Sequence, residues 1–251
     1  MAAPIALQLY TVRDALAKNF EKVISQIADM GYIGVESAGF PGITATDAGD
    51  LFAEYGLEVC SAHTPLPVGG QIGQTINIVR DLGIDRIVSG TSPDNFQSVD
   101  SLKQLCDTWN TACREAKDNN LELGLHNHWW EFQEVEGQPS VDLLLEHLDP
   151  EIFFQVDTYW VQTGGANVIE VLEKLEDRTP LLHIKDGPAT PEGDMVAVGQ
   201  GVMDFPAIIE ASMGTAEWLI VELDRCGTDM LEAVAQSYDY LVGAGLARGA
   251  K

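Results

Sequence analysis

Eight repeats of one pattern constrain this chain more than any other feature. In each repeat a short apolar run precedes a longer stretch whose hydrophobic residues recur at the helical period, as between Phe20 and Met30. Strands that alternate with helices in this way are typical of parallel strands joined by helical crossovers. The strands are expected at 5–10, 33–36, 58–63, 86–90, 121–128, 153–157, 181–185 and 218–222.

Eight such units close most naturally into a (β/α)8 TIM barrel, an α/β fold. A barrel of this kind takes about 250 residues. The chain has 251, so residues 1–251 are interpreted as a single barrel domain. An open doubly wound sheet is the competing architecture, but the first strand is not followed by the GxGxxG turn of that fold.

The charge balance narrows the class of partner. The chain has 39 Asp and Glu residues against 14 Lys and Arg, a formal net charge of −25. Such a surface repels phosphate backbones and anionic membranes, so neither nucleic acid nor a membrane is an expected partner. The N-terminus does not have the pattern of a signal peptide, and the four cysteines form no CxxC pair. We therefore expect a soluble, cytoplasmic protein.

Residues that can carry chemistry gather at the ends of the expected strands. In a TIM barrel the active site is built there and in the loops that follow. One histidine at a strand end is more often a core residue, but several acidic groups in one closed mouth repel each other unless a cation joins them. The pattern therefore predicts a divalent-metal site. The residues at these ends are Glu36, His63, His126, His128, Asp157, His183, Lys185 and Glu222.

Alternation along the strands favours a mixed shell of imidazole and carboxylate groups. His126 and His128 are two residues apart and share one face of their strand, as do His183 and Lys185. Such a shell suits Mn²⁺, Co²⁺, Fe²⁺ or Zn²⁺ better than Ca²⁺, and tolerates Mg²⁺. Two alternatives stay open, namely a helix cap for Asp157 and a salt bridge to a neighbouring carboxylate for Lys185.

Further residues near these ends are candidates for contact with a substrate. An aromatic wall against the apolar face of a sugar is one interpretation of the tryptophans, and core packing is the other. Arg13 is either a substrate contact or a surface cation. The expected substrate-binding residues are Gln8, Tyr10, Glu36, His63, Trp129 and Trp160.

These motifs are similar to those of the sugar phosphate isomerase/epimerase family, in the xylose isomerase-like TIM barrel superfamily. The resemblance implies a sugar isomerase or epimerase that holds Mn or Co with Glu, Asp, His and Glu from its fifth to eighth strands. In such enzymes the two glutamates move protons on either side of a metal-bound enediolate. The stretches that carry the resemblance are 8–14, 34–36, 156–159, 183–186, 199–201, 204–205 and 221–222.

When the ligand set of the family is carried over to this sequence residue by residue, three of the four metal ligands match and one differs. Asp157, His183 and Glu222 match the last three ligands, but His126 stands where the first glutamate is expected, with His128 two residues on. This His-Asn-His pattern resembles a branch near relatives of inosose dehydratase. Glu222 and one imidazole are then the implied base and acid, with Lys185 beside them. The implied cofactor is a divalent metal, Mn²⁺ first, with Co²⁺, Mg²⁺, Zn²⁺ and Fe²⁺ as alternatives.

The leading hypothesis is a metal-dependent isomerase or epimerase of a small sugar, sugar phosphate or keto-polyol. A dehydratase acting on a keto-sugar or inosose is the alternative, because both reactions begin by abstracting an α-proton. A non-catalytic sugar-binding barrel is the third interpretation, and the net charge argues against an apurinic-site endonuclease. The scarcity of cations at the strand ends favours an unphosphorylated carbohydrate. Because relatives often form dimers or tetramers, a homodimer or a homotetramer is the assembly to test for.

Overall fold

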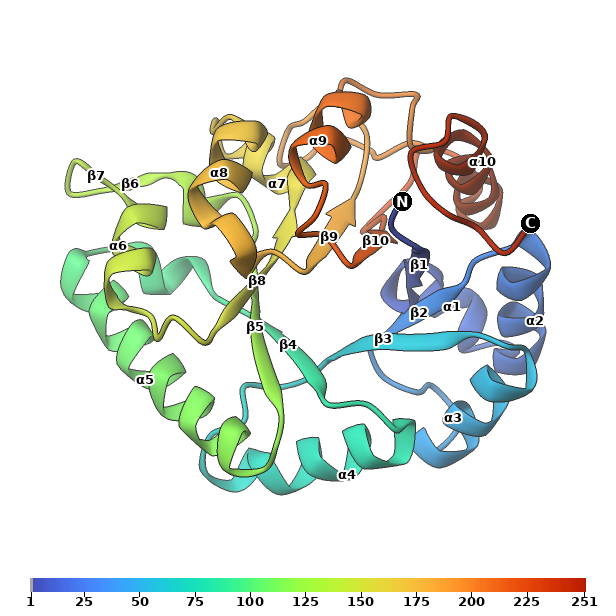
Figure 1. Cartoon of the computed structure of the whole chain (residues 1–251), viewed down its shortest axis with the longest axis horizontal. Helices are drawn as coiled ribbons and strands as arrows, with labels where there is room; N and C mark the ends of the chain where they lie inside the picture. Colours follow the sequence, from blue (N-terminus) through green and yellow to red (C-terminus); the bar gives the residue numbers. More distant parts are fainter. Residues whose placement is uncertain (1) are drawn as a thin grey trace.

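Eight parallel strands close into a barrel in the computed structural model of the chain, which describes residues 2–251. Their order is β1-β10-β9-β8-β5-β4-β3-β2, so that the last strand pairs with the first. The helices form a ring around the barrel (Figure 1). The predicted TIM barrel is confirmed. Its strands are β1 (Ile5–Gln8), β2 (Gly34–Ser37), β3 (Glu58–His63), β4 (Arg86–Gly90), β5 (Glu122–His126), β8 (Phe153–Asp157), β9 (Leu181–Ile184) and β10 (Trp218–Val221).

Local sequence signals set the ends of the surrounding helices. Asn19 and Ser98 accept hydrogen bonds from first-turn backbone N–H groups that have no partner inside the helix. Gly31 and Gly83 end two helices in the left-handed conformation, at φ 107° and 70°. The helices are α1 (Arg13–Leu16), α2 (Phe20–Met30), α3 (Ala45–Glu54), α4 (Ile72–Leu82), α5 (Val99–Asp118), α6 (Ser140–His147), α7 (Thr158–Thr163), α8 (Val168–Leu175), α9 (Phe205–Ala211) and α10 (Met230–Gly243).

The observed strands differ from the expected ones mainly at the barrel mouth. Strands β3, β4 and β8 have the expected bounds, whereas β1, β5, β9 and β10 end one or two residues early. After β1, for example, the chain turns at once into a short 3-10 helix, Leu9–Val12. A hairpin of β6 (Glu134–Val135) and β7 (Gln138–Pro139) was not expected. Its turn places Glu136 and Gly137 at positive φ, as two-residue hairpin turns require.

The interior of the barrel is layered. Because side chains alternate along a strand, residues two apart point into the barrel together. Gly124 leaves space there for Phe153, since a Cβ at this glycine would overlap the ring. The layer nearest the N-terminal ends is a buried apolar cluster of Ala6, Cys60, Val88, Phe153, Leu181 and Ile220. Two residues farther along four of these strands lie the polar side chains of Gln8, Gln155, His183 and Glu222.

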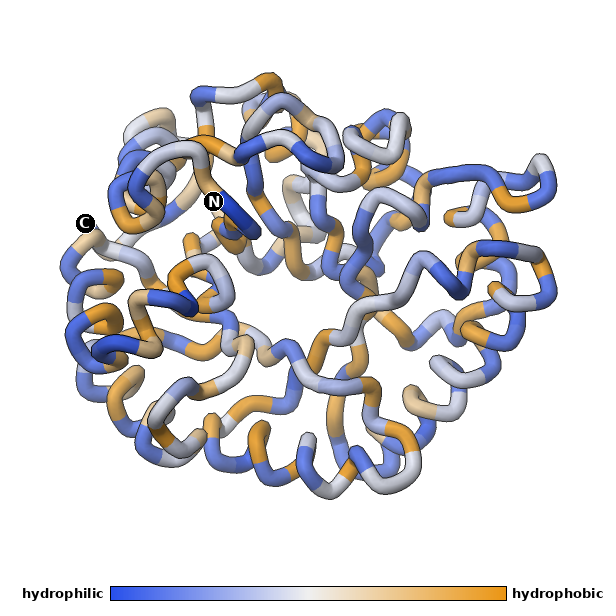
Figure 2. The backbone as a smooth tube through the Cα atoms, turned by 180° about the vertical axis from the view of Figure 1, so that it is seen from behind, coloured by the Kyte–Doolittle hydropathy of each residue, from blue (hydrophilic) through white to orange (hydrophobic). Residues whose placement is uncertain are grey.

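A larger apolar core fills the space between the strands and the helices. Hydrophobic and hydrophilic residues alternate along the outer helices (Figure 2), and in α2 the side chains of Phe20, Val23, Ile24 and Ile27 are buried. Cys106 and Cys113 of α5 are buried in this core. Among residues 2–251, no helix is both long and apolar enough to cross a membrane. The buried polar side chains inside the barrel lie toward the carboxyl ends of the strands.

Candidate active site and metal centre

A cavity of about 340 Å³ opens at the carboxyl ends of the strands. Its walls come from β1, β2, β3, β4, β5 and β10 or from the loops that follow them. Imidazole and carboxylate groups dominate the lining, which is the composition expected of a site that binds a cation. The lining residues are Tyr10, Ala38, His63, Gly90, His126, His128, Glu222 and Asp224.

Four buried side chains converge beside this cavity in an arrangement suited to a metal ion. His126, Asp157, His183 and Glu222 each offer one ligand atom, and these atoms lie within 4.8 Å of one another. Asp157 Oδ2 is buried and accepts no hydrogen bond of good geometry, although Lys185 Nζ lies 2.9 Å away. An under-used carboxylate oxygen facing two imidazoles is a natural ligand position. The residues therefore fit a divalent cation of the borderline type.

Asp157 serves two purposes at once. Its Oδ1 accepts a hydrogen bond from the backbone N–H of Trp160 and so caps α7, while its Oδ2 faces the cluster. The amide of Asn127 pairs with the backbone of Asp157 in both directions. The helix cap and the place in the cluster are therefore both present, and the cap fixes the orientation of the carboxylate.

Lys185 is the central cation of the site. Its ammonium lies 2.9 Å from Asp157 Oδ2, 2.8 Å from Glu222 Oε2 and 2.8 Å from Asp224 Oδ2. Burial opposes its charge, but the three carboxylates raise its pKa well above the ordinary value. Burial likewise raises the pKa of Asp157, while for Glu222 burial is outweighed by Lys185 and His183, which hold its pKa well below the usual range. The predicted salt bridge of Lys185 is present.

The two histidines of the cluster are in opposite electrostatic states. Burial, together with neighbouring histidines, holds the pKa of His126 well below its ordinary value, so the ring is neutral. His183 lies between Glu222 Oε2 and Glu36 Oε2, each 2.6 Å from one of its nitrogens. Burial alone would lower the pKa of His183, but these carboxylates raise it to about 10. A ligating histidine must give up one proton, so cation binding at this cluster releases a proton.

The structure divides the predicted substrate-binding residues into two groups. Tyr10 and His63 line the cavity, and Tyr10 is 43% exposed. Gln8 and Glu36 are fully buried, and Gln8 donates to Glu36 over 2.5 Å. Trp129 and Trp160 pack against the hydrophobic core. The six residues are therefore not one contact surface, and a direct contact with substrate is geometrically open to Tyr10 and His63.

His128 is held on the cavity wall by Trp130 and Glu131. Its ring stacks on Trp130 with a centroid separation of 4.2 Å, and the backbone N–H of His128 donates to Glu131 over 2.8 Å. Glu131 is buried, and its second oxygen accepts from Thr91. The signal in the sequence for this group is an acidic residue three positions after His128.

Gln155 and Asp224 are two further site residues that were not predicted. Gln155 is fully buried and contacts Glu36, His63 and His126. Alternation gave a signal for it, because Gln155 lies two residues before Asp157 on the same face of β8. Asp224 had no such signal, since it lies beyond the end of β10 in an irregular loop.

Comparisons with known proteins agree with this architecture. The family model described as xylose isomerase-like TIM barrel matches residues 24–242. Inosose dehydratase of Clostridium beijerinckii is 23% identical over 168 residues, 59% of this chain and 54% of that protein, so the chain spans about half the length of this relative. Inosose dehydratase of Geobacillus kaustophilus is 22% identical, with 88% of this chain and 83% of that protein covered.

A solved structure shares the whole fold. The sugar phosphate isomerase/epimerase from Parabacteroides distasonis superposes with a TM-score of 0.86 at 24% identity, covering 98% of this chain and all of that one. The family resemblance predicted from the motifs is confirmed. With its closed eight-stranded barrel and a family match over most of its length, the chain belongs to the xylose isomerase-like TIM barrel family.

Proposed function

We propose that the chain is a divalent-metal-dependent isomerase or epimerase of a small sugar or keto-polyol. The observation that carries this proposal is the convergence of His126, Asp157, His183 and Glu222 beside one cavity, in a family of sugar-converting enzymes. A bound divalent cation would polarise a substrate carbonyl and its neighbouring hydroxyl, which makes the intervening C–H more acidic. The four clustered residues would hold the cation.

The protein's own groups supply the proton transfers. Glu222 contacts both His183 and Lys185 through Oε2, which leaves its Oε1 to accept a proton from the substrate. His128 lies on the same cavity and is not a member of the ligand cluster, so its imidazole is placed to return a proton. Lys185 keeps the surrounding carboxylates ionised. A base and an acid on one cavity are what isomerisation by proton transfer requires.

The lining of the cavity favours an unphosphorylated substrate. Among the described residues, no lysine or arginine lines it, whereas Glu222 and Asp224 do. Lys185 is fully buried among three carboxylates. Arg13 is engaged with the backbone carbonyls of Tyr10 and Asp224, over 2.7 Å and 2.9 Å. A phosphate would therefore meet negative charge without a free cation to bind it.

The alternative function is a dehydratase acting on a keto-sugar or inosose. It is favoured by the two inosose dehydratase relatives and by the imidazole of His126 at the position of a family glutamate. Removal of a proton next to a carbonyl is common to both reactions. The difference lies in the next step, in which a dehydratase must protonate a departing hydroxyl, a role open to His128.

Metal content tests the shared part of both functions. Protein purified without chelator is expected to contain about one Mn, Co, Zn or Fe per chain by elemental analysis, and Asp157→Ala and Glu222→Ala are expected to lose it. Asp177→Ala, which removes an aspartate at the opposite end of the barrel, is the matched control and should keep the metal. A metal content equal to that of the wild type in both Asp157→Ala and Glu222→Ala would contradict the proposal.

Product mass separates the two functions. The metal-loaded protein is incubated with a panel of unphosphorylated keto-sugars, aldoses and inososes, and products are followed by mass spectrometry. Isomerisation or epimerisation conserves mass, and incorporation of one solvent deuterium in D₂O reveals the proton transfer. Dehydration lowers the mass by one water. Turnover of phosphorylated sugars alone would overturn the conclusion drawn from the cavity lining.

A further inference from the structure

Glu36 is buried at the centre of a ring of donors. Its side chain is 0% exposed, and Ser61 Oγ donates to Oε1 over 2.6 Å. Gln8 Nε2 donates to Oε2 over 2.5 Å, and His183 Nε2 lies 2.6 Å from the same oxygen. The side-chain nitrogen of Gln155 donates to Oε1. A carboxylate can only accept hydrogen bonds, so each of these neighbours must turn a proton toward Glu36.

This requirement fixes the orientation of the Gln155 amide. Its nitrogen must face Glu36, so its oxygen must face the other way. That oxygen, Oε1, lies 2.7 Å from His63 Nε2 and 3.1 Å from His126 Nδ1. An amide oxygen has two acceptor positions and no proton. Both histidines must therefore donate to it, which places a proton on Nδ1 of His126.

The ring of donors thereby decides which histidine nitrogens face the cluster. His183 uses Nε2 for Glu36 and turns Nδ1 toward Glu222 Oε2 and Asp157 Oδ2, at 2.6 Å and 4.0 Å. His126 uses Nδ1 for Gln155 and turns Nε2 toward Asp157 Oδ2, at 4.0 Å. His183 and His126 thus turn different ring nitrogens, Nδ1 and Nε2, toward Asp157 Oδ2, and the buried carboxylate of Glu36 is the reason for both orientations.

We propose that Glu36, acting directly on His183 and through Gln155 on His126, selects the ring nitrogens with which both histidines bind the metal. The inference rests on the proposed metal site and makes Glu36 and Gln155 positioning residues of that site. Hydrogen-bonding partners of ligating histidines orient the ring and fix its tautomer. Here one carboxylate orients two ligands, the second of them through an amide relay.

An isosteric variant tests this arrangement because it cannot accept hydrogen bonds from all of the donors around Glu36. In Glu36→Gln, an NH₂ group replaces one of the two acceptor oxygens. In the Oε1 position it forces the Gln155 amide to flip, and the His126 proton moves to Nε2. In the Oε2 position it faces both Gln8 Nε2 and His183 Nε2. The Gln8 amide must then flip, His183 Nε2 must accept, and the His183 proton moves to Nδ1. Either outcome puts a proton on a nitrogen that faces the metal.

The first measurement is metal affinity by isothermal titration with Zn²⁺ and with Mn²⁺. Glu36→Gln is expected to weaken binding about 10- to 100-fold, the usual effect of losing such a partner. Ser61→Ala removes a donor from Glu36 but adds none, so it should leave the affinity unchanged. Glu122→Gln makes the same chemical change at the N-terminal end of the barrel and is the matched control. Weakening by all three variants equally would overturn the proposal.

The second measurement does not depend on whether a variant folds. Nitrogen NMR of ¹⁵N-histidine in the Zn²⁺-loaded wild type should show coordinated Nδ1 and protonated Nε2 for His183, and the reverse for His126. The same tautomer for both rings, or the reversed pair, would overturn the positioning role while leaving the metal enzyme intact. A wild type that binds neither Zn²⁺ nor Mn²⁺ would instead overturn the proposed function and this inference with it.

Discussion

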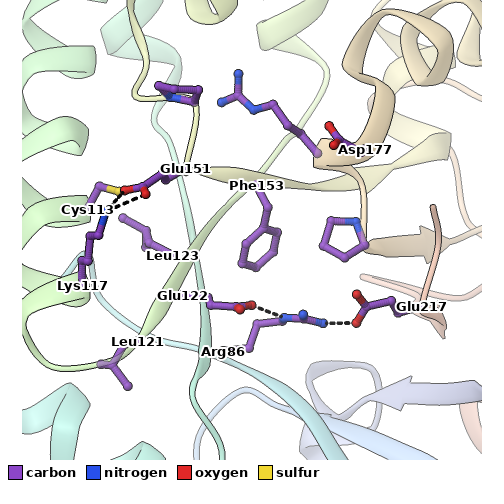
Figure 3. Close-up of a pocket in the computed structure, with 13 residues that line it drawn as sticks. Arg86, Cys113, Lys117, Leu121, Glu122, Leu123, Glu151, Phe153, Asp177 and Glu217 are labelled. Atoms are coloured by element: carbon purple, nitrogen blue, oxygen red, sulfur yellow. Dashed lines mark hydrogen bonds and ion pairs between the residues drawn. The ribbon is translucent and has the colours of Figure 1, made fainter.

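The two ends of the barrel both carry charged clusters next to a cavity, but they organise charge in opposite ways. At the N-terminal end, Arg86 lies between Glu122 and Glu217, 3.0 Å and 2.8 Å away, and both glutamate side chains are 57% exposed (Figure 3). At the carboxyl end, three carboxylates share the ammonium of Lys185, which is fully buried. The N-terminal cavity is the larger, about 480 Å³ against 340 Å³.

The contrast shows that charge arrangement, and not cavity size, distinguishes the candidate site. Exposed ion pairs are screened by water and contribute little to stability. The N-terminal cluster, which lies where strands begin, therefore needs no functional explanation. Buried carboxylates that outnumber their cation are costly and persist where function requires them. The smaller cavity, with its histidines, is therefore the active site that we propose.

The largest expected effect follows removal of the buried cation. Lys185→Met should lower the free energy of unfolding of metal-free protein by about 3–5 kcal/mol, because it leaves buried carboxylates uncompensated. Urea denaturation monitored by circular dichroism measures this change. Added Mn²⁺ should restore part of the loss, since a cation would neutralise the same oxygens. A loss below about 1 kcal/mol, the range of exposed pairs, would remove the distinction between the two ends.

A second expected effect concerns stabilisation by metal. Mn²⁺ at 100 times its dissociation constant should raise the unfolding free energy of the wild type by about 2.7 kcal/mol. Asp157→Asn should abolish this gain, as thermal melts with and without Mn²⁺ would show.

The N-terminal end offers the matched control for metal stabilisation. Cys113, Asp149 and Glu151 also bring ligand atoms within 4.8 Å of one another, but Lys117 already pairs with Glu151 at 2.6 Å. Cys113→Ser should therefore keep the full stabilisation by Mn²⁺. A gain lost in Cys113→Ser and kept in Asp157→Asn would move the metal site to the N-terminal end.

The fold could be predicted from sequence because its signals are local. Alternation of strand and helix periods, with glycine stops such as Gly31 and Gly83, is enough to count eight units. The barrel then brings strand ends together whatever their sequence separation. For this reason His126, Asp157, His183 and Glu222 were predicted as neighbours, and the structure places them within 4.8 Å of one another.

The rest of the site depends on which atoms face each other, and the sequence does not carry that information. Alternation places Gln155 on the same face of β8 as Asp157, but its hydrogen bonds to Glu36 and His126 are visible only in three dimensions. Asp224 reaches Lys185 from a loop whose path Arg13 secures by a hydrogen bond to the Asp224 carbonyl. Glu36 was predicted as a substrate contact, but the structure surrounds it with protein donors.

A smaller effect is expected from crowding His128. A Cβ at Gly90 would lie 3.1 Å from Cε1 of His128, whose ring also stacks on Trp130. Gly90→Ala should therefore shift the ring by a few tenths of an ångström and lower kcat/KM by about tenfold, less than a full ångström of misplacement costs. Steady-state kinetics on the substrate found by mass spectrometry measures the change. Metal affinity should not change, and a loss of metal would place His128 among the ligands.

The smallest effect is expected at the N-terminal end. Arg86→Met removes two ion pairs, but both partners are more than half exposed and remain solvated without the arginine. The unfolding free energy should fall by about 1 kcal/mol or less. Activity and metal content should match the wild type, because Arg86 lies at the start of β4, at the opposite end from the cluster. The pair Arg86→Met and Lys185→Met, measured side by side in urea, tests the comparison directly. Equal losses would mean that burial of the carboxyl-end cluster has no special cost.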